Sequence, residues 1–371
     1  MNSIFWELLR IAIGKQERIS RSLSENEWKS LFRQIEKQSV IGVCVYAISK
    51  LPAEQQPQEE ILSAWKDATA EIYLTNGIMD AYTAKIWKKL THDGLDAAIL
   101  KGQGLAPYYG ELAKYRQPGD IDIWVKGGFD KVNVYVQSTI PSEITDYHHF
   151  HYHVFDSAGV EVELHHRPAL MRNPFDNMRL QRWCDTFDKS TFLYLDDKRF
   201  AIPSIAFNRI FLIIHAYKHF IFDGIGIRQV MDCYQLLRNT HPDKDEMQTF
   251  RDLHLLPFLR AMMWVFAYVF EGCQEEEITE DRFPWMLCKP DAKEGRFLLE
   301  EIMQSGNFAQ DDSRYHFKHF SKIRFQTKHG FHILTHYPSE ILWMPLWLVW
   351  HQWWKLSKRL KNMRRTGTLH Q

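Results

Sequence analysis

The sequence has few cysteines and no excess charge of either sign, and each deficit excludes a class of protein. Its five cysteines are scattered and odd in number, and no two are spaced as a Cys-x-x-Cys pair. A disulfide framework or a zinc site made of thiolates is therefore not expected. Lysine plus arginine and aspartate plus glutamate number 46 each. No overall field attracts nucleic acid or an acidic membrane, so such a partner would need a local patch.

The beginning of the sequence also lacks the uninterrupted apolar run of a secretory signal. Glu7 and Arg10 break the pattern within the first fifteen residues, so we expect a cytoplasmic protein. Hydrophobic residues make up 45% and aromatic residues 14% of the 371 positions. This composition can fill a substantial core, and the length suits two domains with flanking helices.

Residues 1–92 are predicted to be helical. Ser24 and Glu27 resemble a capping box ahead of one helix. Residues 51–58 contain two prolines and are predicted to form a loop. A long helix should then begin at residue 59 or 60 and end near residue 92, where an Asp-Gly pair follows.

Strand, turn and helix signals mix over residues 93–200, which predicts an α+β domain. Strands are predicted at residues 97–100, 121–125, 149–155 and 160–165. A hairpin turn, Asp156 to Gly159, should join the last two of them.

Helical periodicity returns after Ser204 and predicts a helical domain over residues 201–338. Within it, residues 311–330 are polar and basic, and they are predicted to be irregular. Residues 339–371 form a tryptophan-rich, basic tail.

Asp120 and Asp122, at the start of the predicted 121–125 strand, are the first candidates for chemistry. Side chains alternate along a strand, so Asp120 and Asp122 project from one face. Two carboxylates so close repel each other unless a cation lies between them. Mg²⁺ prefers oxygen ligands and leaves positions for substrate phosphates. The pair therefore suits phosphoryl or nucleotidyl transfer with two metal ions, and Glu161 or Glu163 on a neighbouring strand would supply a third carboxylate.

A Lys-Gly turn precedes this strand. Backbone N–H groups at Lys101-Gly102 would point at phosphate oxygens where a helix begins, and Arg116 would add charge. Taken singly, an Asp-x-Asp or a Lys-Gly is more often a structural feature than a catalytic one. The order of strand, Lys-Gly turn, helix, Asp-x-Asp strand, hairpin and Glu strand is the stronger argument.

Three short runs carry a resemblance to a known family. Leu-Lys-Gly at residues 100–102, Arg-x-Pro-Gly-Asp-Ile-Asp-Ile at 116–123 and Val-Glu-Leu-His at 162–165 resemble the uncharacterised nucleotidyltransferase family of the DNA polymerase β superfamily. The resemblance spans roughly residues 30–310. The helical region adds weaker similarities: His215 with His219, Arg228 with Asp232, and Gly306-Asn307-Phe308.

The resemblance implies an α+β fold, with a nucleotidyltransferase-like mixed sheet domain flanked by N-terminal helices and a C-terminal helical domain. It also implies Mg²⁺-dependent transfer of a nucleoside monophosphate from a triphosphate such as ATP to an acceptor, which is a protein, an RNA or a small molecule. Carried over by position, Asp120 and Asp122 are metal ligands and Glu163 is the third catalytic carboxylate.

Lys101, Gly102 and Arg116 are then the substrate-binding residues. The sequence departs from the superfamily pattern here, because a Gly and a Ser or Gly usually stand closer to the aspartates. The third acid is a Glu where Asp is commoner. The phosphate-binding part is therefore less well matched than the metal site.

Histidines crowd the predicted 149–155 strand. His151 and His153 share a face and would suit a transition metal together with Glu161. The alternative, which we favour from sequence, is that these histidines pair with carboxylates or pack beside the site. For His215 and His219, bracing the two domains is favoured over substrate contact.

The tail allows three interpretations. Its apolar stretch, residues 341–350, is shorter than the ~20 residues that span a bilayer. Trp343, Trp347, Trp350 and Trp354 would form a stripe on a helix. This stripe and the basic run from residue 355 to 365 suit a helix on an anionic membrane surface, and therefore a membrane-associated protein. The same combination of tryptophans and basic residues suits RNA binding, in which bases stack on aromatic rings and phosphates meet positive charge. A helix docked on the protein is as well supported as the membrane contact.

Two other functions remain alternatives to catalysis. One is a catalytically weakened module that binds a nucleotide without turnover. The other is a protein-interaction component, such as an antitoxin-like or surface-polysaccharide assembly partner, in which the tail dominates.

Overall fold

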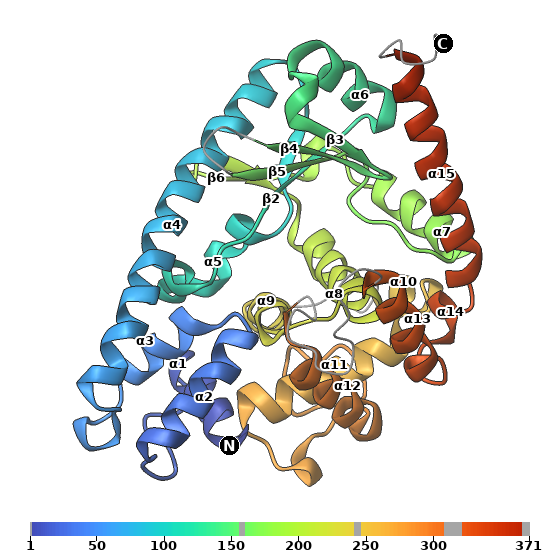
Figure 1. The fold of residues 1–371 in the computed structure, drawn as a ribbon. Helices are drawn as coiled ribbons and strands as arrows, with labels where there is room; N and C mark the ends of the chain where they lie inside the picture. The colour runs from blue at the N-terminus through green and yellow to red at the C-terminus, as the bar shows by residue number, and fades with distance from the viewer. Residues whose placement is uncertain (1, 156–159, 241–245, 308–320, 366–371) are drawn as a thin grey trace.

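A computed structural model describes residues 2–155, 160–240, 246–307 and 321–365 (Figure 1). Three predictions lie outside these ranges: the hairpin turn at 156–159, the motif residue Phe308 and the irregular stretch at 311–320. The side chains of residues 321–326 and of those beyond residue 357 also lie outside the described set, so the basic run of the tail after residue 357 is described only as backbone.

A five-stranded sheet forms the centre of the upper half of the molecule (Figure 1). Its strands are β1 (Ala97–Ile99), β2 (Ile121–Val125), β3 (Thr145–His148), β4 (His151–Phe155) and β5 (Glu161–His165), in the order β1-β2-β5-β4-β3. The β2–β5 pair is parallel and the other pairs are antiparallel. The predicted α+β class with a mixed sheet is therefore confirmed.

The two faces of the sheet differ in polarity. Ile121, Ile123 and Leu164 point to one face and pack in a small hydrophobic core with side chains of α4 (Glu59–His92) and α6 (Gly128–Thr139). The alternate residues of β2, β4 and β5 point to the other face, where acidic and histidine side chains collect. A two-stranded sheet, β6 (Leu193–Leu195) with β7 (Phe200–Ile202), closes the same core.

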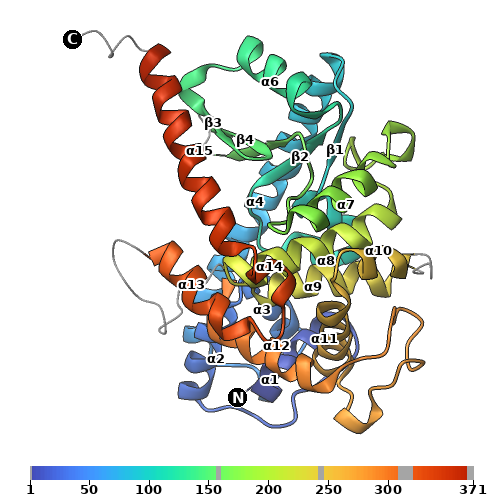
Figure 2. The ribbon, with the colours of Figure 1, turned by 90° about the vertical axis from the view of Figure 1, so that its right-hand side faces the viewer.

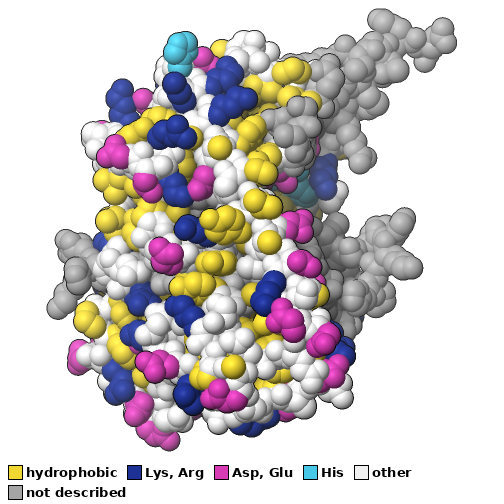
Figure 3. All heavy atoms as spheres, turned by 90° about the vertical axis from the view of Figure 1, so that its left-hand side faces the viewer, with side chains coloured by type: hydrophobic (Ala, Val, Ile, Leu, Met, Phe, Trp, Pro, Cys, Tyr) yellow, Lys and Arg dark blue, Asp and Glu magenta, His cyan; other side chains and the backbone are white. Residues whose placement is uncertain are grey.

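The N-terminal helices follow the sequence prediction closely. They are α1 (Asn2–Ala12), α2 (Glu25–Lys37), α3 (Ile41–Ser49) and α4. The backbone N–H of Ser24 donates to the Glu27 carboxylate over 2.9 Å, as a capping box requires. Helix α4 ends at His92, and Gly94 after it adopts φ +82°, a conformation that favours glycine. Viewed from the α4 side, acidic and basic side chains are interspersed with apolar ones (Figure 3).

The remaining helices lie below and beside the sheet (Figures 1 and 2). They are α5 (Ala106–Tyr109), α7 (Pro174–Asp185), α8 (Ile205–Phe222), α9 (Ile227–Arg238), α10 (Glu246–Asp252), α11 (Leu256–Phe266), α12 (Ala292–Ser305), α13 (Ser321–Ile333), α14 (Pro338–Ile341) and α15 (Met344–Arg365). A large core joins α1–α3 with α8–α12, so the N-terminal and C-terminal helical regions pack together. The domain boundaries drawn from sequence stay a prediction.

Residues 321–330 were predicted to be irregular, and the structure corrects this: they form most of α13. Among its described side chains, Ile333 is buried in the large core and two histidines make polar contacts. The His329 ring hydrogen-bonds the Phe220 carbonyl over 2.8 Å, and His332 lies 3.1 Å from the Glu301 carboxylate. Gly330 packs so closely on Met344 that an added Cβ would lie 2.3 Å from its methyl carbon.

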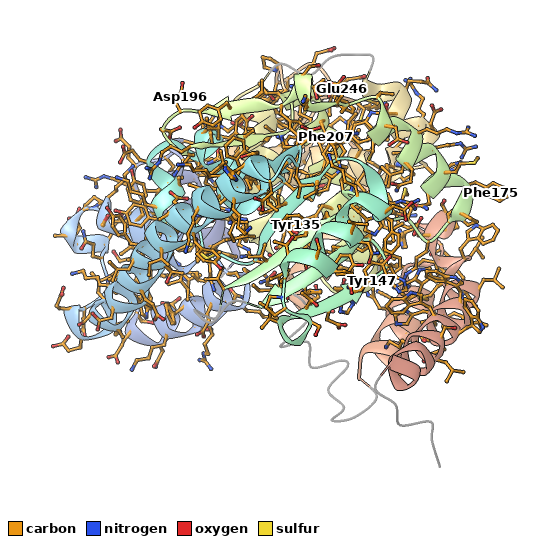
Figure 4. All side chains as sticks on the ribbon, turned by 90° about the horizontal axis from the view of Figure 1, so that it is seen from above. Tyr135, Tyr147, Phe175, Asp196, Phe207 and Glu246 are labelled. Atoms are coloured by element: carbon orange, nitrogen blue, oxygen red, sulfur yellow. The ribbon has the colours of Figure 1, made fainter. Side chains whose placement is uncertain are left out.

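The tail is helical from Met344 to Arg365 and lies along the side of the sheet (Figure 2). His149, between β3 and β4, contacts the rings of Trp347, Trp350 and Trp354. Tyr147 and Phe175 lie beside the same helical segment, from β3 and α7 (Figure 4). The predicted tryptophan stripe therefore contacts the protein. Among the described residues, no helix has the length and apolarity needed to cross a bilayer.

The start of the tail is tied to the rest of the fold by a buried carboxylate. Glu340, 2% exposed, accepts hydrogen bonds from the backbone N–H groups of Arg172 and Asn173 over 2.7 and 3.2 Å. Burial, only partly offset by these donors, raises the pKa of Glu340 to about 7. Its folded pKa therefore exceeds its unfolded value of about 4.5.

The stabilisation from Glu340 should thus be full below about pH 4.5 and lost as the pH rises through about 7. Relative to Glu340→Gln, which does not titrate, the wild type should lose about 3 kcal/mol of unfolding free energy between pH 4.5 and 8. Urea denaturation of both proteins at several pH values measures this difference. A difference that stays constant with pH contradicts the prediction.

Candidate active site

Strand register places the polar side chains in rows across the sheet. Asp122 on β2 lies opposite Glu163 on β5, and Glu163 lies opposite His153 on β4. In the neighbouring row, His165 on β5 lies opposite His151 on β4. Because side chains alternate along a strand, all five point to the same face.

The three predicted carboxylates come together on this face. Asp120, Asp122 and Glu163 each offer a carboxylate oxygen, and these oxygens lie within 4.8 Å of one another. Glu161 lies beside this group but does not belong to it, and its carboxylate contacts His153 Nδ1. The geometric prediction that Glu163 and not Glu161 joins the aspartates is confirmed.

Two cationic side chains balance these carboxylates. Lys101 Nζ lies 3.0 Å from Asp122 Oδ2 and 3.5 Å from Asp120 Oδ2. His165 Nε2 lies 2.9 Å from Asp122 Oδ1 and 3.0 Å from Glu163 Oε2. Asp122 is 2% exposed. A carboxylate so buried needs partners of this kind, and the cluster supplies them.

The pKa values of this cluster reflect mutual stabilisation of charge. Burial alone would raise the pKa of Glu163, but the hydrogen bond and charge of His165, together with Lys101, lower it to about 2. Burial opposes protonation of His165, yet Asp122 and Glu163 hold its pKa above the ordinary value. Burial likewise opposes the charge of Lys101, and the three carboxylates outweigh it and raise its pKa. Glu163 is therefore ionised at neutral pH.

The predicted phosphate-binding turn lies next to the carboxylates. Gly102 adopts φ +58°, and a Cβ added there would stand 3.6 Å from the carbonyl oxygen of Asp120. Gly102 and Arg116 both line a cavity of about 240 Å³, together with Lys114 and Lys198. The structure thus brings two of the three predicted substrate-binding residues, Gly102 and Arg116, to one cavity. The third, Lys101, forms ion pairs with Asp120 and Asp122.

Arg116 is also held firmly by the fold. Its guanidinium donates to both oxygens of Asp232 on α9, over 2.7 and 2.8 Å, and Tyr109 Oη donates to the same carboxylate over 2.6 Å. Arg228 of α9 donates to the carbonyls of Gln117 and Pro118 over 3.1 and 3.2 Å. The two arginines fix the loop that leads into the aspartates. A role of Arg116 in phosphate binding stays a prediction.

One cation on this face, Lys218, is not singled out by any sequence motif described above. Lys218 of α8 has its Nζ 4.2 Å from the ring of Phe150. Burial lowers the pKa of Lys218 to about 8, and the charges of Asp223 and Glu163 oppose that shift. His215 and Lys218 stand three residues apart and therefore share one face of a helix; this spacing is the sequence feature that could have pointed to Lys218. His215 contacts the rings of Phe211 and His219 on the same helix, and its bracing role stays a prediction.

Comparison with known proteins places most of these residues in one family pattern. The pattern of a family described as "Uncharacterised nucleotidyltransferase" matches residues 24–271, which include the whole sheet and its carboxylates. No curated protein matches the chain. One similar solved structure is the crystal structure of an antigenic nucleotidyltransferase-like protein from Paracoccidioides brasiliensis. It has 15% sequence identity and a TM-score of 0.34, over 52% of this chain and 91% of that one.

Proposed function

This chain belongs to the uncharacterised nucleotidyltransferase family, and from that premise we propose that it transfers a nucleoside monophosphate from a nucleoside triphosphate to an acceptor hydroxyl. The convergence of Asp120, Asp122 and Glu163 on one face of the sheet supports this proposal more than any other observation. Acceptor candidates are a protein, an RNA or a small molecule.

The donor atoms fit magnesium. All three groups are carboxylates, and hard divalent ions prefer oxygen ligands. Asp120, Asp122 and Glu163 would hold the metal, which when bound aligns the phosphates and neutralises the departing pyrophosphate. With a pKa of about 2, Glu163 is a weak base. We therefore assign Glu163 to metal binding in preference to proton abstraction.

The cations around the carboxylates have distinct proposed roles. Lys101 forms an ion pair with Asp122, and Lys218 feels the charges of Glu163 and Asp122, so we propose that both bind phosphate oxygens. Gly102 lines the cavity and has no side chain to fill it. We propose that this cavity holds a part of the nucleotide. Arg116 would need to give up Asp232 to bind phosphate directly, so its main proposed effect is to hold the loop.

The test of the proposed function is a labelling experiment. The protein is incubated with each α-labelled nucleoside triphosphate, Mg²⁺ and a cell extract, and the labelled product is separated as protein, RNA or small molecule. Transfer of label that requires Mg²⁺ supports the proposal. Nucleotide binding without any transfer would instead identify a catalytically weakened binding module.

The tail supports a second proposal, a peripheral contact with an anionic membrane. One face of α15 is docked through its tryptophans, and the opposite face is apolar and exposed. The exposed side chains on it are Leu346, Val349, Trp353 and Leu356. They recur at helical spacing, as in helices that lie in a membrane interface.

A charge on the exposed face should weaken membrane binding. We expect Val349→Glu to reduce sedimentation with anionic liposomes several-fold, because it removes apolar area and adds repulsion. Gln352→Glu adds the same charge at an exposed polar position and serves as the matched control. Truncation at residue 339 is a poorer test, since it also removes Glu340. Equal sedimentation of wild type and Val349→Glu, at low and high salt, would exclude the membrane contact.

A further inference from the structure

A second group of metal-ligand side chains lies one strand away from the aspartates. His151 Nε2 and His153 Nε2 lie 2.8 Å apart, and each lies 3.5 Å from Glu163 Oε1. His151 is buried, and the side chain of His153 is 17% exposed. Three donor atoms from two neighbouring strands therefore face one point.

We propose that His151, His153 and Glu163 bind one divalent transition-metal ion of the zinc class. Two imidazoles and a carboxylate form a ligand set that zinc uses, and imidazole nitrogen favours such ions over magnesium. With metal–ligand bonds of about 2.0–2.1 Å, tetrahedral ligands stand roughly 3.3 Å apart. The two 3.5 Å separations match this value, and the imidazole pair would open by about 0.5 Å.

The orientation of the histidines supports the assignment. Glu161 contacts His153 Nδ1 and accepts its hydrogen, which leaves the Nε2 lone pair of His153 directed at the other two donors. A carboxylate behind a ligating histidine is a common arrangement in metal sites, where it fixes the tautomer and ring orientation. Pairing with Glu161 thus accounts for His153 Nδ1, and without an ion the contact between the two Nε2 atoms is a hydrogen bond that His151 donates to His153; the ion would replace this hydrogen bond.

Glu163 connects this site to the aspartates. Its Oε1 faces the two histidines, while its Oε2 lies 3.0 Å from His165 Nε2, which also contacts Asp122. One carboxylate therefore belongs to both groups. The ion would hold Glu163 in its place among the aspartates, and its binding does not depend on nucleotidyl transfer.

Metal titration of the full-length protein tests this proposal. Chelator-treated protein, shown by circular dichroism to be folded, is titrated with Zn²⁺ by calorimetry and with Co²⁺ by visible absorption. We expect one equivalent of Zn²⁺ to bind, millimolar Mg²⁺ not to displace it, and Co²⁺ to show the intense bands of a tetrahedral site. Glu161→Gln should weaken Zn²⁺ binding about 10- to 100-fold. His151→Ala and His153→Ala should weaken it further.

Two controls separate this site from the others. His92→Ala removes an exposed histidine on α4 and should leave Zn²⁺ affinity unchanged. Asp120→Asn should keep Zn²⁺ affinity even if it abolishes transfer, so failure of the proposed function would not mimic failure of the metal site. Should His151→Ala fail to fold, His153→Gln provides the ligand test. Absence of Zn²⁺ binding by folded wild type, or wild-type affinity in a folded variant at position 151 or 153, overturns the proposal.

Discussion

Asp120→Asn should reduce nucleotidyl transfer by more than about 1,000-fold while the protein keeps its fold. The amide cannot replace a charged oxygen ligand, so the metal that aligns the triphosphate would be held poorly. Asp120 is only partly buried and its nearest cation, Lys101, also has Asp122 as a partner. Its replacement therefore leaves no unpaired charge. Initial rates with labelled triphosphate, together with thermal denaturation, measure both effects.

Asp122→Asn should reduce nucleotidyl transfer as strongly as Asp120→Asn does, but it should also lower the free energy of unfolding. Asp122 is buried against Lys101 and His165, so neutralising it deprives a partly buried lysine and a buried histidine of one partner each. Relief of repulsion between the aspartates alone would predict a small gain. Asp146→Asn changes a half-exposed carboxylate on β3; it is the matched control and should keep full activity. Full activity of either Asp120→Asn or Asp122→Asn would exclude the proposed metal site.

The second large effect should come from the buried pair of Arg116 and Asp232. Arg116→Ala leaves the buried Asp232 carboxylate of α9 without its positive partner, with only the Tyr109 hydroxyl still donating to it. We expect the free energy of unfolding to fall by about 3–5 kcal/mol. Asp232→Ala should destabilise the protein similarly, because it leaves the guanidinium unpaired. Urea denaturation gives both values.

The double variant Arg116→Ala with Asp232→Ala distinguishes the two roles of Arg116. It leaves neither charge unpaired, so it should recover part of the lost stability. The exposed pair of Arg21 and Glu27 offers a control, since Arg21→Ala should have little measurable effect. A stable Arg116→Ala variant with weakened triphosphate binding would show instead that Arg116 acts mainly on phosphate.

Local periodicity was sufficient to predict much of the fold and of the carboxylate cluster. The period of two over residues 120–125 predicted that Asp120 and Asp122 share one face, and the family resemblance selected Glu163. What the sequence could not supply was register. The parallel pairing of β2 with β5 puts Asp122 opposite Glu163, and no local pattern specifies a partner so distant in the chain.

Other features depended on contacts that no local pattern reveals. The carboxylate that fixes Arg116 comes from α9, and Lys218 reaches the sheet only because α8 packs beneath it. Strand β3 was missed because its four residues, Thr145–His148, carry no run of β-branched or aliphatic side chains. Helix α13 was predicted to be irregular because its sequence is polar and basic, and two of its histidines contact α8 and α12 through hydrogen bonds that no local pattern specifies.

The parallel pair at the centre of the sheet also bears on how the chain reaches its native state. Strands β3 and β4, and then β4 and β5, pair as neighbours in sequence and bridge only short stretches of chain. Joining β2 to β5 must close a loop that contains α6 and two whole strands. Loop closure of this kind costs entropy before its contacts form, and it slows folding. The carboxylate cluster is therefore expected to assemble late, after the β3–β4–β5 meander has formed.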